Sequence, residues 1–166
     1  MLCLVGKGGS SRVFKVISNE GMVFALKRVS LKNLDDFTFN SYLNEIDLLQ
    51  RFTDSDCKHI IKLVDSEVNR QSGYLMILME YGEVDLGRML RERQGMDPVE
   101  KMHFVKFYFQ QMLKAIQSVH DAKIVHCDLK PANFLLVQGT LKLIDFGISK
   151  AILNDTTNIV RENQVG

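Results

Sequence analysis

The stretch IVHCDLKPANFLL, residues 124–136, follows a long segment of helical periodicity and leads into a short hydrophobic run. It places Asp128, Lys130 and Asn133 within six residues. Loops carry a disproportionate share of functional side chains, so a carboxylate, an ammonium and an amide gathered here indicate a site. His126 belongs to the same stretch, and we interpret it as a packed, hydrogen-bonded histidine because that is the commoner case.

The flanks of this stretch predict a helical region and a pair of strands. Asp97 is a good N-cap and Pro98 suits a first helical position, so we predict a helix from Pro98 to about Asp121. Its apolar residues spread widely round the axis, which indicates neighbours on most sides. After the loop, residues 134–137 (FLLV) and 141–145 (LKLID) are predicted strands that close round QGT.

The N-terminal half alternates with the period of strands, apart from one segment of helical spacing that begins near Thr38. A non-periodic joint, YGEVD (residues 81–85), separates it from the helical part. The pattern predicts an α+β protein of two lobes, residues 1–80 and residues 81–166, with a seam where ligands commonly bind. The predicted strands are residues 2–5, 12–17, 22–29, 61–68 and 74–80.

Two charges interrupt apolar stripes in the N-terminal half. Alternation places Lys27 on the same strand face as Ala25 and Val29. In the helical segment, Glu45 lies beside Leu49 on the apolar face. A lone buried charge costs several kcal/mol, so we predict that Lys27 and Glu45 pair. In the alternative, Lys27 extends its ammonium to solvent and Glu45 lies at the edge of the stripe.

The turn GKGGSSRVF, residues 6–14, is rich in glycine. Glycines there let the backbone approach a ligand closely, and the N–H groups of such a turn can cradle phosphate. The turn lies between two predicted strands, which excludes a Rossmann or Walker loop because both of those precede a helix. Taken alone, the turn is equally compatible with a flexible hairpin.

The composition restricts the function classes. The chain has 166 residues, of which 46% are hydrophobic and 25% charged, as in an ordinary globular domain. A net charge of +1 gives no field for nucleic acid or an anionic membrane, and the longest apolar run, residues 74–79, is too short to span a bilayer. Cys3, Cys57 and Cys127 are widely spaced, which favours free thiols over disulfides or a zinc site.

Five motifs occur in one order along the chain: GKGGSSRVF, FALK, Glu45, HCDLKPAN and DFG. In this combination the sequence resembles a eukaryotic protein kinase over essentially its whole length. GGSSRVF, LKPANFLLV, LKLIDFGI and the segment DTTNIV to NQVG are similar to the monopolar-spindle (TTK-like) dual-specificity kinases. The resemblance implies a kinase-like two-lobe fold, with a five-stranded antiparallel sheet plus one helix in the first lobe and an incomplete helical second lobe.

The resemblance implies transfer of the γ-phosphate of ATP, with Mg²⁺, to Ser or Thr of protein substrates, with Tyr as a further acceptor. Lys27 would contact the α- and β-phosphates and Glu45 would hold it in place. Asp128 would accept the hydroxyl proton of the substrate, and Lys130 would neutralise the γ-phosphate during transfer. Oxygen ligands suit Mg²⁺. Its ligands would be Asn133 and Asp145.

The resemblance also implies a nucleotide site in the seam. The adenine ring would lie between apolar walls with Met79 at the back, and its edge would hydrogen-bond backbone groups from Glu80 to Gly82. The nucleotide-binding residues implied in this way are Val5, Gly6, Gly8, Gly9, Ser11, Val13, Ala25, Lys27, Met79, Glu80, Gly82 and Leu135.

Two positions depart from the common kinase pattern. Ser11 replaces the third glycine of the phosphate loop. Cys127 stands where kinases usually have an Arg that pairs with a phosphorylated activation loop, and a cysteine cannot make that charge-assisted contact. Thr156 and Thr157 are candidate phosphorylation sites by resemblance, or ordinary loop threonines. If they are modified, the candidate partners are Lys150 and Arg161.

Family resemblance further implies spindle assembly checkpoint signalling, kinetochore and checkpoint partners, and a location in nucleus and cytoplasm, at the kinetochore and spindle. Two alternatives remain open: a nucleotide-binding pseudokinase, and a truncated, catalytically incompetent kinase fragment. The second arises because kinases of this family continue beyond Gly166, so the sequence is expected to end inside the activation segment. We therefore expect residues 1–166 alone to associate and to lack transfer activity.

Overall fold

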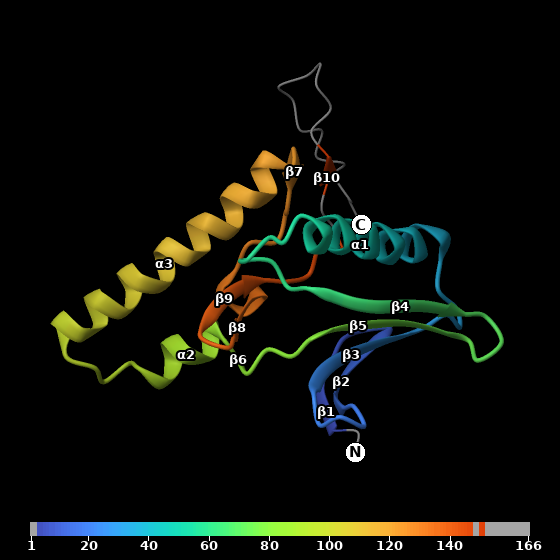
Figure 1. Cartoon of the computed structure of the whole chain (residues 1–166), viewed down its shortest axis with the longest axis horizontal. Helices are drawn as coiled ribbons and strands as arrows, with labels where there is room; N and C mark the ends of the chain where they lie inside the picture. Colours follow the sequence, from blue (N-terminus) through green and yellow to red (C-terminus); the bar gives the residue numbers. More distant parts are fainter. Residues whose placement is uncertain (1–2, 148–149, 152–166) are drawn as a thin grey trace, which may run out of the picture.

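The computed structural model of the chain describes residues 3–147 and 150–151. Its N-terminal half is a five-stranded antiparallel sheet in the order β1-β2-β3-β5-β4 (Figure 1). All five predicted strands are confirmed, although β1 extends to Lys7 and β4 begins at Leu63. The strands are β1 Cys3–Lys7, β2 Ser11–Ile17, β3 Val23–Ser30, β4 Leu63–Asn69 and β5 Tyr74–Glu80.

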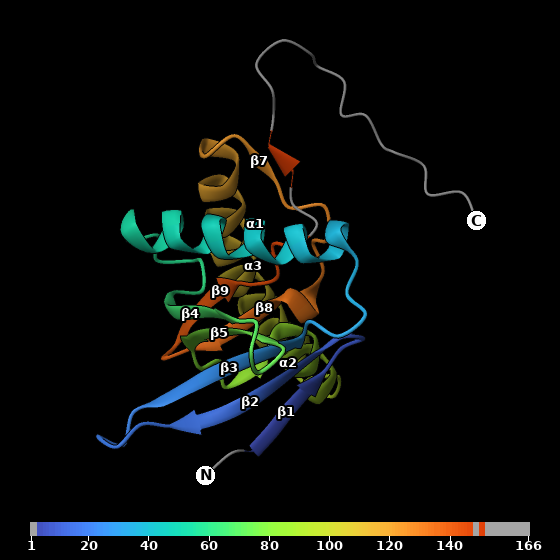
Figure 2. The same ribbon diagram turned by 90° about the vertical axis from the view of Figure 1, so that its right-hand side faces the viewer.

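Helix α1, Asp36–Asp54, covers one face of this sheet (Figures 1 and 2). It begins two residues before the predicted start, because Asp35 caps it by accepting a hydrogen bond from Thr38 N at 2.8 Å. The helix buries Leu49 and Phe52 in the core. Each such side chain contributes about 1.5–3 kcal/mol relative to exposure. No helix of the described part covers the opposite face of the sheet (Figure 2).

The C-terminal half contains the predicted helix and several short elements that the sequence did not separate. Helix α3 begins where predicted, with Asp97 accepting from Val99 N at 2.8 Å. The joint at residues 81–85 was predicted as irregular, but its end forms a short strand that pairs with β8. The elements are β6 Val84–Asp85, α2 Leu86–Glu92, α3 Pro98–Asp121, β7 Ile124–Val125, η1 Pro131–Asn133, β8 Phe134–Val137, β9 Thr140–Leu143 and β10 Lys150–Ala151.

One core joins the two halves. Leu143 of β9 accepts a hydrogen bond from Ile61 N at 3.1 Å and donates one to the His59 carbonyl at 2.9 Å. These bonds fix the segment before β4 against β9, and Ile61 and Phe134 are buried where they meet. The loop after α3 is thereby held beneath the sheet and α1.

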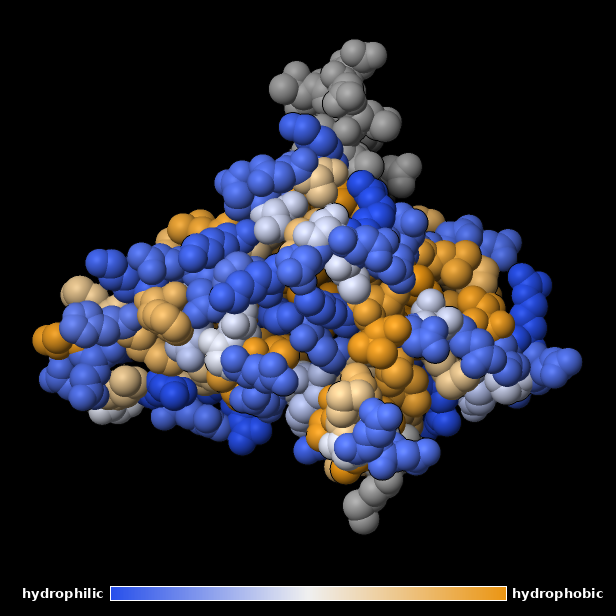
Figure 3. Space-filling view, in the orientation of Figure 1, coloured by the Kyte–Doolittle hydropathy of each residue, from blue (hydrophilic) through white to orange (hydrophobic). Residues whose placement is uncertain are grey.

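Helix α3 exposes large apolar side chains among the described residues. Met102 is 68% exposed, Phe109 53% and Leu113 50%, and Figure 3 shows hydrophobic residues at the surface where α3 lies. This agrees with the expectation that the helix is apolar on more sides than its described neighbours cover. No helix within residues 3–147 and 150–151 is long and apolar enough to cross a membrane.

We expect residues 1–166, purified alone, to self-associate through this face of α3, because exposed apolar patches promote association. The double substitution Phe109→Ser and Leu113→Ser removes two neighbours one turn apart and should shift the chain toward monomer in size-exclusion chromatography with light scattering. Val64→Ser is the control, since Val64 is 48% exposed on β4. A monodisperse parent chain would contradict the prediction.

Candidate active site

The ion pair predicted between strand and helix is present. Lys27 Nζ of β3 donates to both carboxylate oxygens of Glu45 on α1, each at 2.7 Å. The Glu45 side chain is 2% exposed and that of Lys27 13%. Burial raises the pKa of Glu45 and the contact with Lys27 opposes that rise. Tyr42 lies beside the ammonium, with its ring centroid 5.2 Å from Nζ. The pair therefore fixes the Lys27 ammonium between β3 and α1.

The loop residues Asp128, Lys130 and Asn133 form a hydrogen-bonded group. Lys130 Nζ donates to Asp128 Oδ2 at 2.6 Å. Asn133 Nδ2 donates to the same oxygen at 3.0 Å and to the Asp128 carbonyl at 2.9 Å. Both partners of the Asn133 amide are acceptors, so its nitrogen must face Asp128 and its oxygen faces elsewhere. The short helix η1 turns Asn133 back onto Asp128, which brings the predicted loop residues together.

This arrangement keeps Asp128 ionised. The hydrogen bond from Lys130 lowers the pKa of Asp128, with a smaller contribution from Asn133, and partial burial opposes it. The same contact raises the pKa of Lys130. A carboxylate held in this way is oriented and negative at neutral pH.

His126 has the structural role predicted for it. It is 2% exposed, and its Nε2 donates to the Ile144 carbonyl at 2.9 Å, while Nδ1 accepts from Asp128 N at 3.3 Å. One tautomer satisfies both contacts. The ring packs edge-on against Phe146 at 5.0 Å, and Phe146 lies 5.4 Å from Phe52 of α1. The histidine thus ties the loop to the segment that carries Asp145.

Asp145 occupies a backbone conformation that side chains rarely adopt. Its φ is +67°, as is that of Cys127. The left-handed region costs about 1–2 kcal/mol for most residues, and Asp tolerates it better than Cys. Because a left-handed residue cannot continue a strand, the conformation of Asp145 agrees with the end of β9 at Leu143, two residues before the predicted end at Asp145. A Cβ added at Gly147 would lie 3.6 Å from Asp145 Oδ1 and 3.9 Å from Glu45 Oε2.

Asp145 is electrostatically coupled to both charged groups. After burial, which is the largest cause, the negative charge of Asp145 helps to raise the pKa of Glu45. After the Asp128 hydrogen bond, it also helps to raise the pKa of Lys130. The backbone carries the same connection, since Ile144 N donates to the Asn133 carbonyl at 2.9 Å. The two candidate metal ligands, Asn133 and Asp145, therefore come from adjacent pieces of backbone.

The predicted nucleotide residues of the sheet fall into neighbouring rows. Gly6 lies opposite Val13, and a Cβ at Gly6 would be 3.5 Å from Val13 Cβ. Val13 is opposite Lys27, and Ala25 opposite Met79. The other three predicted residues of this region, Gly8, Gly9 and Ser11, belong to the turn. Gly8 N donates to the Ser11 carbonyl at 2.9 Å, which closes the turn. A Cβ at Gly9 would meet nothing within 4 Å, so the backbone there is open. Val5, at the start of this surface, is 49% exposed.

The joint between the halves approaches the second half closely. A Cβ at Gly82 would lie 2.7 Å from Leu135 Cβ, so only glycine fits there without a shift. The Glu80 N–H is already used, because it donates to the Lys62 carbonyl at 3.1 Å. If the Glu80 backbone binds a ligand, its carbonyl must therefore accept the hydrogen bond. The donors predicted for the adenine edge are then limited to the N–H groups of residues 81 and 82.

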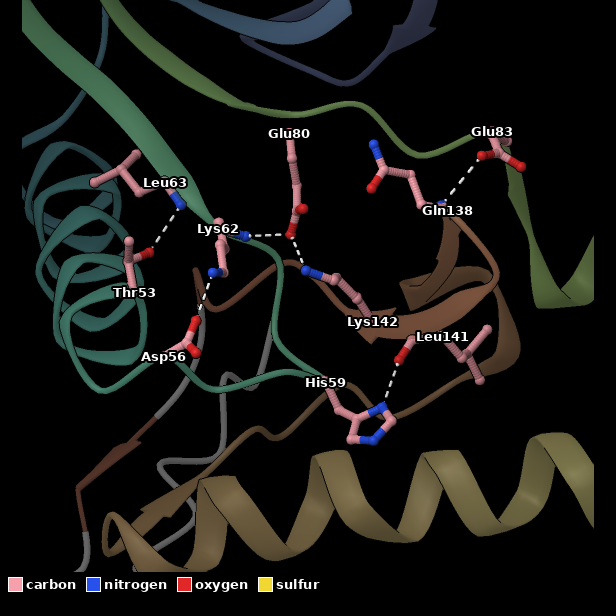
Figure 4. A network of polar contacts seen from close by, with 10 residues as sticks. All are labelled: Thr53, Asp56, His59, Lys62, Leu63, Glu80, Glu83, Gln138, Leu141 and Lys142. Atoms are coloured by element: carbon pink, nitrogen blue, oxygen red, sulfur yellow. Dashed lines mark hydrogen bonds and ion pairs between the residues drawn. The ribbon is translucent and has the colours of Figure 1, made fainter.

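A second ion pair, which the sequence analysis missed, lies behind this joint (Figure 4). Glu80 Oε1 accepts from Lys142 Nζ at 2.5 Å and from Lys62 N at 2.7 Å. Lys142 is 7% exposed on β9, three residues before Asp145. Lys62 in turn pairs with Asp56 at 2.5 Å. The signal was available: Lys142 interrupts an apolar strand, as Lys27 does.

Comparison with known proteins agrees with this geometry. The sequence matches the protein kinase domain family (Pkinase) over residues 2–166. The chain belongs to the protein kinase family. The predicted kinase-like fold is therefore confirmed.

The relatives of this kinase chain carry related names. It is 51% identical over 166 residues to the serine/threonine-protein kinase mph1 of Schizosaccharomyces pombe, covering 99% of this chain and 24% of that protein. It is 49% identical over 163 residues to the serine/threonine-protein kinase MPS1 of Saccharomyces cerevisiae, covering 98% and 20%. For the dual specificity protein kinase TTK of Mus musculus the identity is 43% over 162 residues, covering 98% and 18%. The chain thus spans a quarter or less of the length of these relatives.

The titration of Asp128 tests the loop geometry. The pKa of Asp128 is lowered in the folded protein. At a pH equal to the ordinary pKa of an aspartate, 3.8, we therefore expect its carboxylate to be more than half ionised. Its contribution to stability is present above that pH and is lost as the pH falls through the folded pKa. Lys130→Met should raise the midpoint, whereas Lys114→Met on α3 should not. Carbon-13 NMR of the Asp128 carboxyl group measures both, and an unchanged midpoint in Lys130→Met would refute the assignment.

The Glu80–Lys142 pair should stabilise the joint locally. Removing one partner of a buried pair leaves an uncompensated charge, but Glu80 is 22% exposed, so we expect a local loss of only about 1–3 kcal/mol. In Glu80→Gln or Lys142→Met, the hydrogen-exchange rates of the backbone amides should then rise roughly 5- to 150-fold over residues 76–83 and 140–147.

The exposed pair Arg88–Glu92 supplies the control. Arg88→Gln should leave exchange in the same two segments within about twofold, because surface pairs contribute little. Equal exchange in all three variants would mean that the buried pair does not hold the joint.

Proposed function

We propose that the protein containing this chain is an ATP-dependent kinase that phosphorylates Ser or Thr of protein substrates, with Tyr as a further acceptor. One observation carries the proposal. The segment that carries Asp145 meets the Asp128–Lys130–Asn133 group through the bond from Ile144 N to the Asn133 carbonyl at 2.9 Å. It also approaches the buried Lys27–Glu45 pair, since a Cβ at Gly147 would lie 3.9 Å from Glu45 Oε2. Phosphoryl transfer depends on positioning and charge neutralisation, and these groups supply both.

The nucleotide would lie in the seam between residues 1–80 and residues 81–166, which we propose as the two lobes. Val13 and Ala25 line it from the sheet and Leu135 from the other side, with the glycine turn over the phosphates. Lys27 would contact the α- and β-phosphates, and the fixed position of its ammonium against Glu45 supports this role.

The donor set fits Mg²⁺. Asp145 offers a carboxylate, and the Asn133 amide has its oxygen turned away from Asp128. Mg²⁺ is usually held by one or two such protein oxygens together with substrate phosphates. When bound, the ion would neutralise charge on those phosphates.

The remaining loop residues account for the acceptor. Asp128, ionised and fixed by two donors, is placed to orient the substrate hydroxyl and to take its proton. Lys130 presents a positive charge beside it, where it would neutralise the transferred γ-phosphate. Cys127 is exposed and uncharged, so it offers no cation to a phosphorylated loop.

We also propose a role in spindle assembly checkpoint signalling, with kinetochore and checkpoint proteins as partners and a location at the kinetochore and spindle in nucleus and cytoplasm. Similarity to proteins named Mps1, mph1 and TTK supports this proposal. Depletion of the protein followed by microscopy of chromosome segregation tests it, and normal checkpoint arrest in depleted cells would count against it.

Three substitutions in the full-length protein separate the proposed roles. Lys27→Met should abolish phosphoryl transfer while leaving much of the nucleotide affinity. Asp145→Asn should remove Mg²⁺-dependent nucleotide binding. Asp128→Asn should retain binding but lower turnover about 10²- to 10⁴-fold, the usual contribution of a positioned base.

Binding is measured with a fluorescent ATP analogue and transfer with a generic protein substrate. Exposed Lys58 provides the control, since Lys58→Met changes one charge outside the site. Parent protein that binds Mg-ATP without transfer would identify a pseudokinase instead, and equal loss of binding in the two aspartate variants would remove the distinction between their roles.

Thr156 and Thr157 lie outside the described residues, and their phosphorylation stays a proposal. If the full-length protein phosphorylates itself there, Cys127 cannot form an ion pair with the phosphothreonine. A cationic side chain elsewhere must pair with it, and Lys150 and Arg161 are the candidates. Phosphopeptide mapping of active enzyme should find at least one of the two threonines modified. Unmodified threonines in active enzyme would end the proposal.

A further inference from the structure

A second hollow, of about 260 Å³, lies at the end of the sheet beside the glycine turn. It shares Gly9 and Ser11 with the proposed nucleotide site, but none of its three charged residues, Lys7, Arg12 and Arg28, is assigned to catalysis or nucleotide binding. Its lining is strongly one-sided in charge: it contains cations and hydroxyl groups and no carboxylate. The lining residues are Lys7, Gly9, Ser10, Ser11, Arg12, Arg28, Ser30 and Tyr74.

Strand register places three cations in one row. Lys7 of β1 is opposite Arg12 of β2, and Arg12 is opposite Arg28 of β3. Adjacent strands are about 4.8 Å apart, and like charges directly opposite each other destabilise a sheet. Lys27 faces α1, so Arg28 next to it points to the opposite face, which no described helix covers (Figure 2). The row is therefore accessible from solvent.

No acidic side chain of the described residues pairs with this row. Beyond Arg28 the row continues through Met76 to Glu67 on β4. Glu67 is two strands away, on the order of 10 Å, and accepts a hydrogen bond from Asn69 Nδ2 at 2.9 Å. At about one Debye length, its charge compensates the three cations poorly.

Arg28 is held in place by two aromatic rings. Its guanidinium carbon lies 5.1 Å from the Phe14 ring centroid and 4.7 Å from that of Tyr74. The guanidinium makes no ion pair among the described residues, and its N–H groups match the paired oxygens of a phosphoryl group. The hydroxyl group of Ser30, which lies on the same face of β3 as Arg28, adds a further donor to this wall.

We propose that this hollow binds the phosphoryl group of a phosphothreonine- or phosphoserine-containing protein segment. The choice of a phosphorylated protein rests on the proposed kinase function, which generates such groups. Nucleic acids and anionic membranes are disfavoured because they require an extended positive field, whereas this chain has a net charge of +1 and one small basic hollow. A segment already phosphorylated would thus dock on the outer face of the same sheet that covers the nucleotide.

Binding in the full-length protein, saturated with a non-hydrolysable ATP analogue to occupy the seam, tests the proposal. The probes are inorganic phosphate, a short phosphothreonine peptide and the same peptide without phosphate, each titrated by calorimetry. The phosphorylated peptide should bind, the unphosphorylated one should not, and added salt should weaken binding. Arg12→Gln and Arg28→Gln should each reduce affinity about tenfold or more, while Lys58→Gln should not.

Arg12 is exposed and makes no ion pair in the described part, so Arg12→Gln should fold even if Arg28→Gln does not. Phosphopeptide binding that survives both substitutions would overturn the site. Preferential binding of a DNA oligonucleotide or phosphatidylserine vesicles over the peptide would overturn the choice of ligand. The binding titrations measure no transfer, so their outcomes do not depend on catalysis. Basal transfer to an unphosphorylated substrate should be unchanged in Arg12→Gln, so a failed kinase assay and a failed docking assay are distinguishable.

Discussion

The buried contact between Lys27 and Glu45 is the constraint on which the rest of the site depends. Neither charge can be buried alone at reasonable cost, so strand β3 and helix α1 must meet at one register. That register sets which face of β3 points into the seam, and with it the placement of Val13 and Ala25. The same alternation sends Arg28 to the outer face. One ion pair therefore decides which residues lie on the inner surface, which we propose faces the nucleotide, and which lie on the outer, basic surface.

Asp145 transmits this constraint to the loop. Its backbone is left-handed and follows the end of β9. Two residues on, Gly147 lies close to the carboxylates of Asp145 and Glu45. Behind it, Phe146 packs between Phe52 of α1 and His126 of the loop. A displacement of α1 would thus disturb the Lys27 contact and the Phe146 packing together. The position of the helix and the geometry of the loop are coupled by contacts rather than set independently.

The sequence predicted those features that rest on period or on a misplaced charge. Apolar runs bounded by turn residues indicated all five strands of the large sheet, and a charge within each of two apolar stripes identified the Lys27–Glu45 pair. Lys142 carried the same signal and was overlooked because its strand is only four residues long, which is too short to establish which face is buried. Helix α2, with seven residues, is likewise too short to show a clear period.

Other features depend on contacts between segments remote in sequence and could not be predicted from local pattern. The Glu80 N–H is used by Lys62, and Gly82 is required because Leu135 lies against it. Nothing in the residue types near Glu80 or Gly82 indicates either partner. The left-handed conformation of Cys127 is also unexpected, because cysteine adopts it less readily than Asp or Asn does.

The conformation of Cys127 bears on how the loop can work without an arginine at that position. The carboxylate of Asp128 is neutralised by Lys130 and oriented by Asn133, both of which follow it in the chain. His126, which precedes it, is held by the Ile144 carbonyl and by Phe146. Among the described residues, the side chain of Cys127 takes part in neither set of contacts, and its thiol donates to the Val125 carbonyl at 3.4 Å. The charges of the loop are therefore organised without a cation at residue 127, so the proposed catalytic group is complete without an arginine there.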